Sequence, residues 1–283
     1  MKIAISGSTG FIAKKLKKYL EQDYEIISIY KEDFYNNHAN LIRKIKQCDV
    51  VINLSGYSIF NKWTKDNQNL MVESRVYTTR KIAEAISITD KNITLINNSA
   101  IGIYDTQSIH TEKSTRFESD FLARLVRKWE AEVNKIDKKG VRKVIFRLAI
   151  VLEKDGGMLK KIMPLFKFGM GAKLGTGEQY FSFIHMEDLL RAYKFAIENK
   201  NMQGIYNLSA PGTTTNLEFS KELANNLNRS LLFKVPGKVL QIIFGERADL
   251  MLKGQQVKPA RLLEENFEFE YPNISMTLRD LVK

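Results

Sequence analysis

The chain has 283 residues, 44% of them hydrophobic, and a formal net charge of +12. Such a length and composition are those of a globular protein with a substantial core, and no apolar run is long enough to form a membrane-spanning helix. The single cysteine excludes an intrachain disulfide, and the scattered basic residues lack the clustering expected of a specific nucleic-acid-binding surface.

The first half of the chain alternates short β-branched runs with amphipathic segments. Strands are expected at 2–6, 24–30, 49–54, 94–98 and 143–147, and helices at 11–21, 38–47, 65–87 and 119–139. Strands that alternate with helices in this way form parallel sheets with crossover helices on both faces. The sequence therefore predicts an α/β fold with a doubly wound parallel Rossmann sheet.

The second half is less regular. Glycines such as those of Gly175-Thr176-Gly177 indicate loops of the kind that commonly line sites, and a helix after Asp188 with a strand at 205–208 indicates a return to the sheet. We therefore expect a Rossmann domain and a smaller, mostly helical C-terminal substrate lobe. The Rossmann domain comprises residues 1–151, to which 183–210 return, and the lobe comprises 152–182 and 211–283.

A glycine pattern, Gly7-x-x-Gly10-x-x-Ala13, directly follows the first predicted strand and opens the first predicted helix. This is the context of a dinucleotide-binding turn. Gly7 can adopt positive φ, Gly10 lets the backbone approach a pyrophosphate, and the phosphates then meet free N–H groups at the helix N-terminus. The cofactor-binding residues predicted here are Gly7, Thr9, Gly10, Phe11 and Ile12.

The type of dinucleotide is decided at the end of the second strand. A basic residue there favours the 2′-phosphate of NADP, whereas an acid favours the free 2′-hydroxyl of NAD. Lys31 stands at this position and predicts NADP, but Glu32 and Asp33 follow it and leave NAD as the alternative.

Further segments match a known family in chain order. They include Asp49 to Gly56, Glu73 to Val76, Asn98 to Tyr104, Trp129-Glu130, Phe183 to Asp188 and Gly254 to Leu262. With the glycine turn, they resemble the extended branch of the short-chain dehydrogenase/reductase superfamily, and within it the atypical sugar-nucleotide epimerase-like (YfcH-type) family with its C-terminal domain. The resemblance implies NAD(P) binding and assigns Leu54, Ser55 and Gly56 to the cofactor site.

The catalytic residues of that superfamily are incompletely present. Extended members use a Tyr-x-x-x-Lys pair with a Ser or Thr and an Asn, and the tyrosine acts as the acid/base. The matching segment 121–130 contains no tyrosine, and Ser74-Arg75 stands where the asparagine is expected. Ser99 matches the serine beside the nicotinamide, where it would donate to a developing oxyanion, and Tyr104 is the candidate substitute for the acid/base.

Other polar residues are candidates for a role in the site. Arg75 and Arg147 could each bind an anionic substrate or the cofactor pyrophosphate, with a buried ion pair as the competing interpretation for Arg147. His185 and Asp188 could form a catalytic pair, but a helix cap at Asp188 is the favoured interpretation. The three histidines are too dispersed to predict a metal site.

Two functions are therefore compatible with the sequence. The first is an NADP-dependent reductase or epimerase-like enzyme that acts on a small hydroxyl- or carbonyl-bearing substrate. The alternative is a non-catalytic dinucleotide-binding protein, a redox sensor or scaffold, because the usual catalytic pair is absent. We expect a cytoplasmic protein with a small-molecule substrate and no specific nucleic-acid or membrane partner; a homodimer is an open alternative.

Overall fold

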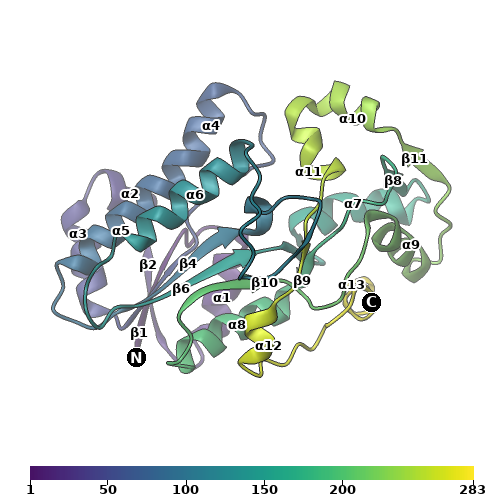
Figure 1. The fold of residues 1–283 in the computed structure, drawn as a ribbon. Coiled ribbons are helices and arrows are strands. Elements are labelled where there is room, and N and C mark those ends of the chain that lie inside the picture. Colours follow the sequence, from purple (N-terminus) through teal and green to yellow (C-terminus); the bar gives the residue numbers. More distant parts are fainter. The chain divides into compact units, whose positions relative to one another are not determined.

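The computed structural model describes residues 1–283 and contains a six-stranded parallel sheet with the strand order β10-β6-β4-β3-β1-β2 (Figure 1). Its strands are β1 (Lys2–Ser6), β2 (Glu25–Ile29), β3 (Val50–Asn53), β4 (Thr94–Ala100), β6 (Arg142–Leu148) and β10 (Gly204–Leu208). All five strands predicted before residue 150 are present in this sheet. The predicted α/β fold with a parallel Rossmann sheet is confirmed.

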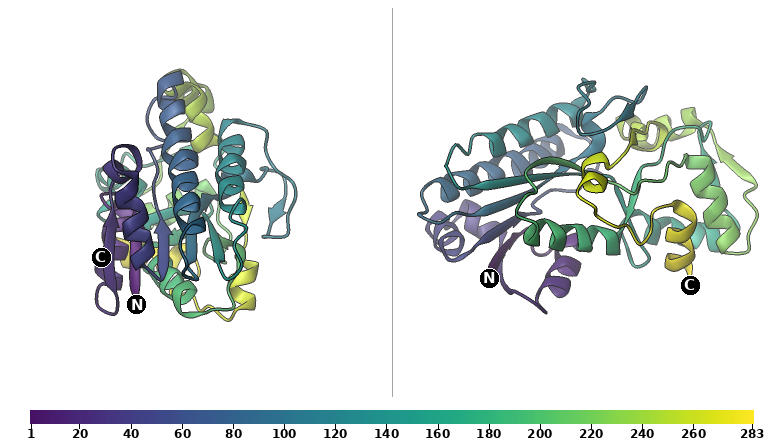
Figure 2. Two further views of the ribbon diagram at one scale, coloured as in Figure 1. Left: turned by 90° about the vertical axis from the view of Figure 1, so that its left-hand side faces the viewer. Right: turned by 60° about the horizontal axis from the view of Figure 1, so that its bottom comes forward.

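Helices cover both faces of this sheet. They are α1 (Phe11–Leu20), α3 (His38–Gln47), α5 (Thr78–Ser87), α6 (Phe121–Asn134) and α8 (Met186–Glu198). Helices α3, α5 and α6 lie side by side on one face, and α1 and α8 lie together on the other (Figures 1 and 2). An ion pair of 2.6 Å between Lys194 of α8 and Asp23, just beyond α1, joins the latter two.

The strand order reverses beside β1, which pairs with β2 on one side and with β3 on the other. Strand β3 is buried along its whole length because helices cover both faces of the sheet. In doubly wound sheets, ligands bind beyond the carboxyl ends of the strands at such a reversal. A ligand-binding site is therefore expected beyond the ends of β1 and β3, at Ser6 and Asn53.

Two local features differ from the sequence-based expectation. A short helix, α2 (Lys31–Tyr35), begins directly after β2, where the sequence predicts no helix. The single helix expected over 65–87 is three consecutive segments, α4 (Lys65–Val72), a π-helical turn (Glu73–Tyr77) and α5. A π-helical turn inside an α-helix is uncommon and is often found at functional sites.

The chain divides into two compact units. The first comprises 1–103, 119–147 and 190–206, and the second comprises 104–118, 148–189 and 207–283. Segment 104–118 belongs to the second unit, although it falls within the range expected for the Rossmann domain. The assignment of the second unit to substrate binding stays a prediction.

The second unit combines short strand pairs with helices around its own core. The strand pairs are β7 (Ile150–Glu153) with β9 (Phe183–His185), β8 (Ala172–Leu174) with β11 (Phe233–Val235), and β5 (Ile109–His110) with β12 (Gln256–Val257). The helices are α7 (Gly157–Lys167), α9 (Asn216–Asn226), α10 (Gly237–Phe244), α11 (Asp249–Leu252), α12 (Ala260–Glu264) and α13 (Ile274–Val282). Phe181, Phe183 and Phe219 lie in an apolar cluster that α7, α9 and α13 share. None of the helices has both the length and the apolar character needed to cross a membrane.

Candidate dinucleotide-binding site

The glycine turn lies at the carboxyl end of β1. Gly7 has φ +63°, a conformation that residues with a Cβ rarely adopt. A Cβ at this position would lie 2.6 Å from the backbone oxygen of Leu54, so the loop after β3 also requires a glycine here. The N–H of Gly10 donates to the backbone oxygen of Gly7 at 2.8 Å and closes the turn.

Helix α1 begins at this turn without a side-chain cap. Its N-cap residue is Gly10, whereas Asn37 caps α3 and Asp120 caps α6 through their side-chain oxygens. The N–H groups of Phe11 and Ile12 belong to the first helical turn, where no backbone acceptor within the helix is available. The start of α1 therefore offers donors and a positive dipole end to an anion such as a pyrophosphate.

A cavity of about 410 Å³ opens beside the turn. It extends from the turn past the start of α2 and the loop after β3 to the helical segment that contains the π-turn. Its lining residues are Gly7, Ser8, Thr9, Ile29, Tyr30, Lys31, Glu32, Phe34, Tyr35, Ser55, Gly56, Tyr57, Leu70, Glu73, Ser74 and Thr78. Five of the residues predicted to bind the cofactor, Gly7, Thr9, Lys31, Ser55 and Gly56, line this one cavity.

Lys31 and the acids that follow it have different surroundings. The Lys31 ammonium lies 5.7 Å from the ring centroid of Tyr35 at the rim of the cavity. Asp33 is 3% exposed, and its carboxylate accepts hydrogen bonds from Lys44 Nζ at 2.7 Å and from the backbone N–H of Tyr30 at 2.7 Å. The short helix α2 therefore withdraws Asp33 from the cavity, while Lys31 and Glu32 remain on its lining.

The Asp33 carboxylate predicts a pH dependence of stability. Burial raises its pKa, but the hydrogen bonds from Lys44 and the Tyr30 N–H outweigh burial and lower the pKa below its usual 3.8. The stabilisation is therefore complete above pH 3.8 and is lost as the pH falls through the lowered value. We expect Asp33→Asn to lower the Tm at pH 7, with a difference from wild type that shrinks below about pH 4. Asp90→Asn, at an exposed position, should show no such pattern in thermal melts across this range.

A buried polar network fixes the ends of β1 and β3. Ser6 Oγ donates to Asn53 Oδ1 at 2.6 Å, and Asn53 Nδ2 donates to Thr79 Oγ1 at 2.8 Å and to Asn97 Oδ1 at 2.7 Å. Ser55 Oγ donates to Ser6 Oγ at 2.9 Å. Because every member is buried and bonded, the network holds the loop after β3 rigidly against the glycine turn.

Arg75 lies in the π-helical turn and contacts Gly56 and Tyr57, two of the lining residues, but does not itself line the cavity. Its Nη1 donates to the backbone oxygens of Tyr57 at 2.9 Å and Met71 at 3.2 Å. The guanidinium lies 5.4 Å from the ring centroid of Trp129. A Cβ at position 56 would lie 3.0 Å from Cζ of Arg75, so the glycine makes room for this side chain. Contact between Arg75 and the cofactor stays a prediction.

Arg147 and Ser99 share one buried partner, Glu130 of α6. The carboxylate accepts from Nε of Arg147 at 2.8 Å, from its Nη2 at 2.7 Å, and from Ser99 Oγ at 2.5 Å. All three residues are buried. The ion pair considered from the sequence for Arg147 is therefore present, and the hydroxyl proton of Ser99 is directed to a carboxylate. The catalytic and cofactor-binding roles predicted for Ser99, and the cofactor-binding role predicted for Arg147, stay predictions.

Tyr104 is fully buried in the second unit. Its hydroxyl donates to Asn207 Oδ1 at 2.9 Å, and its ring stacks on that of His110 with 4.7 Å between centroids. The Tyr104 hydroxyl and ring are therefore both engaged by residues of the second unit. The acid/base role predicted for Tyr104 stays a prediction.

The cap expected near Asp188 is made by a different residue. His185 precedes α8, and its Nδ1 accepts the N–H of Glu187 in the first turn at 3.0 Å. The Asp188 carboxylate instead accepts the backbone N–H groups of Glu270 at 2.8 Å and Tyr271 at 2.9 Å. Asp188 therefore anchors a C-terminal segment within the second unit.

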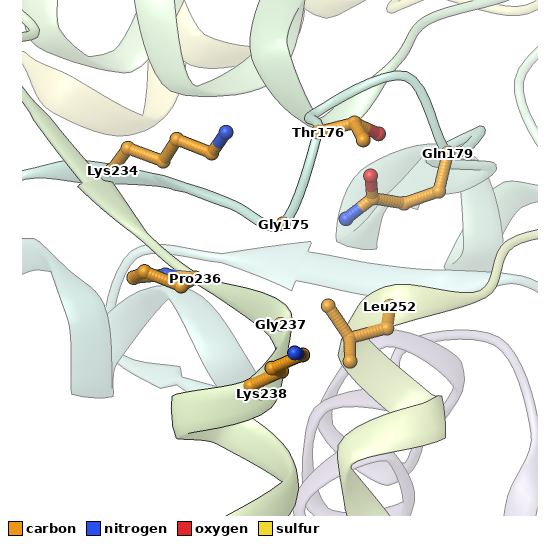
Figure 3. Close-up of a pocket in the computed structure, with 8 residues that line it drawn as sticks. All are labelled: Gly175, Thr176, Gln179, Lys234, Pro236, Gly237, Lys238 and Leu252. Carbon is orange, nitrogen blue, oxygen red and sulfur yellow. The ribbon is translucent and has the colours of Figure 1, made fainter.

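The Gly175-Thr176-Gly177 loop lines a second cavity, of about 390 Å³, within the second unit (Figure 3). Lys234 and Lys238 are two of its lining residues, and Figure 3 shows the Lys234 ammonium directed toward Thr176. The side-chain amide of Gln179 is fixed by hydrogen bonds to the backbone oxygens of Leu174 at 3.1 Å and Met251 at 2.8 Å. The loop expected from its glycines to line a site therefore does line a cavity.

The sheet, the strand-order reversal and the glycine turn at the carboxyl end of β1 together define a Rossmann-type NAD(P)-binding protein. Residues 3–209 match the family described as the NAD dependent epimerase/dehydratase family. The chain belongs to this family, and the resemblance to extended short-chain dehydrogenases/reductases is confirmed. Residues 235–281 match a second family, described as a domain of unknown function (DUF1731), in the region of the predicted C-terminal domain.

Relatives from bacteria and mammals match the whole chain. The epimerase family protein SDR39U1 of Mus musculus is 32% identical, covering 100% of both chains, and YfhF of Bacillus subtilis is 31% identical, covering 100% of this chain and 98% of the relative. A crystal structure of human SDR39U1 (isoform 2) with NADPH superposes with a TM-score of 0.90 at 27% identity, covering 100% of this chain and 99% of the other.

Sequence reasoning missed part of the cavity lining. Tyr30, Tyr35 and Tyr57 contribute aromatic surface, and Glu73 and Ser74 contribute polar groups from the helical segment. Tyr30 and Tyr35 lie within four residues of Lys31, and this proximity in the sequence could have predicted that they share its site. The contribution of Glu73 and Ser74 depends on how a helix distant in sequence packs against the turn.

Proposed function

We propose that this protein binds NADPH in the glycine-turn cavity and exchanges a hydride with a small hydroxyl- or carbonyl-bearing substrate. The observation that carries the proposal is the pairing of the uncapped α1 N-terminus at the turn with Lys31 at the cavity rim, while Asp33 is withdrawn. The NADPH in the crystal structure of human SDR39U1 supports the same cofactor.

In this proposal each part of the cavity has a defined task. Gly7, Thr9 and Gly10 bring the backbone close to the pyrophosphate, which the N–H groups of Phe11 and Ile12 bind. Leu54, Ser55 and Gly56 form the opposing loop, and Lys31 binds the 2′-phosphate. The nicotinamide ring supplies the hydride chemistry when the cofactor is bound.

Ser99 remains the catalytic candidate in this proposal, but as a hydrogen-bond acceptor instead of a donor. Its single hydroxyl proton is directed to the Glu130 carboxylate at 2.5 Å, so its oxygen presents lone pairs to any other partner. Ser99 would therefore accept a hydrogen bond from a substrate hydroxyl rather than donate one to an oxyanion. Such a contact fixes the orientation of the substrate hydroxyl.

The cofactor assignment is tested at Lys31. We expect Lys31→Ala to weaken NADPH binding about 10- to 100-fold, because a charge-assisted hydrogen bond contributes about 1.5–3 kcal/mol. NADH binding should change less than about twofold, since NADH lacks the 2′-phosphate. Both affinities are measured by fluorescence titration of the purified protein.

The neighbouring acid offers a matched control. Glu32→Gln alters a charge on the same cavity lining and should leave the preference for NADPH in place or strengthen it. Equal loss of NADPH and NADH binding in Lys31→Ala would contradict a role in 2′-phosphate recognition. A wild-type protein that binds neither dinucleotide would contradict the proposed function itself.

The location, the partners and the assembly state of the protein are part of the proposal. We propose a cytoplasmic protein that acts on a small molecule without a specific nucleic-acid or membrane partner, with a homodimer as the alternative to a monomer. Static light scattering of the purified protein distinguishes the two assembly states.

A further inference from the structure

Lys44 of α3 forms an ion pair with Asp33, the buried acid two residues after Lys31. Its Nζ lies 2.7 Å from the Asp33 carboxylate, and the side chains of the two residues are 19% and 5% exposed. Neither residue lines the glycine-turn cavity, but the backbone N–H of Tyr30, which does line it, donates to the same carboxylate oxygen at 2.7 Å. The ion pair is therefore one hydrogen bond removed from the cavity rim at which Lys31 lies.

The Lys44 ammonium is fixed by its surroundings. Besides the Asp33 carboxylate, it donates to the backbone oxygen of Ser28 in β2 at 3.0 Å, and it lies 5.3 Å from the ring centroid of Tyr30. Two hydrogen bonds and a cation–π contact therefore hold the positive charge at the end of the strand that leads to Lys31.

The other contacts of the Asp33 carboxylate come from neutral donors. Its Oδ1 accepts the side-chain amide of Asn40 at 2.5 Å, and Arg43 donates to the oxygen of that amide at 2.6 Å, which fixes the orientation of the amide. Burial raises the pKa of Asp33, but the hydrogen bonds from Lys44 and the Tyr30 N–H outweigh burial and keep the carboxylate charged at neutral pH. Lys44 is therefore the group that balances this buried negative charge.

An Asp33 carboxylate without Lys44 would act on the cavity. A buried carboxylate that keeps only neutral donors is costly, so it either turns toward water at the rim beside Tyr30 and Lys31 or stays in place with its charge uncompensated. At the rim, an acid that follows the second strand accepts the ribose 2′-hydroxyl of NADH. In either position its negative charge repels the 2′-phosphate of NADPH.

We propose that Lys44 is a positioning residue for the choice of cofactor, because it holds Asp33 out of the cavity and balances its charge. The inference rests on the proposed function, in which Lys31 binds the 2′-phosphate. It adds a second requirement, since Lys31 selects NADPH only while the acid two residues away is bound to Lys44. The segment Lys31-Glu32-Asp33, which leaves NAD and NADP open in the sequence, is thus decided by a residue of the next helix.

The test compares the affinities for NADPH and NADH in variants of the full chain, both measured by fluorescence titration. We expect Lys44→Met to lower the ratio of NADPH affinity to NADH affinity about 5- to 20-fold, because the unbalanced carboxylate repels the 2′-phosphate. The affinity for NADH should stay within about twofold of the wild type or increase, since NADH lacks that phosphate. A purely structural role of Lys44 would lower both affinities alike and leave the ratio unchanged.

Rescue variants identify Asp33 as the group through which Lys44 acts. Lys44→Met/Asp33→Asn removes both charges and should return the ratio to within about threefold of the wild type, and Lys44→Arg, which keeps the cation, should do the same. Lys46→Met, at an exposed position of the same helix and outside the cavity lining, should leave the ratio unchanged. If Lys44→Met does not fold, Lys44→Gln carries the test, since it is uncharged but can still donate to Asp33.

Two results would overturn the inference. The first is an unchanged ratio in Lys44→Met, including the case in which both affinities fall equally. The second is a lowered ratio that the added Asp33→Asn substitution does not restore, since Lys44 would then act without Asp33. A wild type that binds neither dinucleotide contradicts the proposed function instead. Loss of NADPH selectivity in Lys31→Ala together with an unchanged ratio in Lys44→Met would leave the proposed function standing and remove only this inference.

Discussion

Gly7→Ala is expected to abolish most of the affinity for NADPH while leaving a folded protein. The alanine must either keep φ near +63° or move its Cβ away from the Leu54 backbone oxygen, which would otherwise lie only 2.6 Å from it. Strain of this kind costs about 1–3 kcal/mol, and the turn can relieve it only by shifting the N–H groups that meet the pyrophosphate. A loss of about 2–3 kcal/mol corresponds to roughly 30- to 100-fold weaker binding, measurable by fluorescence titration.

Gly102→Ala is the matched control for this substitution. Gly102 lies in the short 3-10 helix Ile101–Ile103, without positive φ, and a Cβ there meets no atom within 4 Å. The variant should bind NADPH within about twofold of the wild type, because substitutions free of such features change free energies by only about 0.5 kcal/mol. Equal affinity of Gly7→Ala and Gly102→Ala would mean that the turn is not the pyrophosphate site.

The parts of the fold that the sequence predicted are those determined locally. The glycine turn depends on residues within one strand-turn-helix unit, so Gly7 and Gly10 identify it without knowledge of distant contacts. The buried strand β3 can also be predicted from its local sequence, because its apolar run implies burial on both faces.

The parts that the sequence did not predict depend on packing between distant segments. Lys31 and Asp33 are two residues apart, yet only the formation of α2 places one at the cavity rim and the other against Lys44. The position of Ser99 in the sequence identifies it as a candidate, but its bond to Glu130 joins residues 31 apart. The sequence raises a buried ion pair as one interpretation of Arg147 but does not identify its partner, because Glu130 lies 17 residues earlier on a different element.

Glu130→Ala is expected to cause the largest loss of stability among single substitutions near the site. It leaves Arg147, a residue that is 3% exposed, without its counter-ion, and it removes the acceptor of the Ser99 hydroxyl. Removal of one partner from a buried ion pair costs about 3–5 kcal/mol. At about 2–4 °C per kcal/mol for a chain of this size, the Tm should fall by roughly 6–20 °C in a thermal melt followed by circular dichroism.

The same helix provides a control for this prediction. Glu132 is also buried, but its partners Arg80 and Lys135 have side chains 48% and 62% exposed, so solvent can replace the lost carboxylate. Glu132→Ala should therefore be clearly less destabilising than Glu130→Ala. The double variant Glu130→Ala/Arg147→Met removes the orphaned charge and should recover part of the lost Tm, because the cost lies in the unpaired guanidinium rather than in the missing carboxylate. If the double variant were less stable than Glu130→Ala alone, the guanidinium would be stabilising without its partner, and the interpretation of these three residues as one charge-balanced cluster would be wrong.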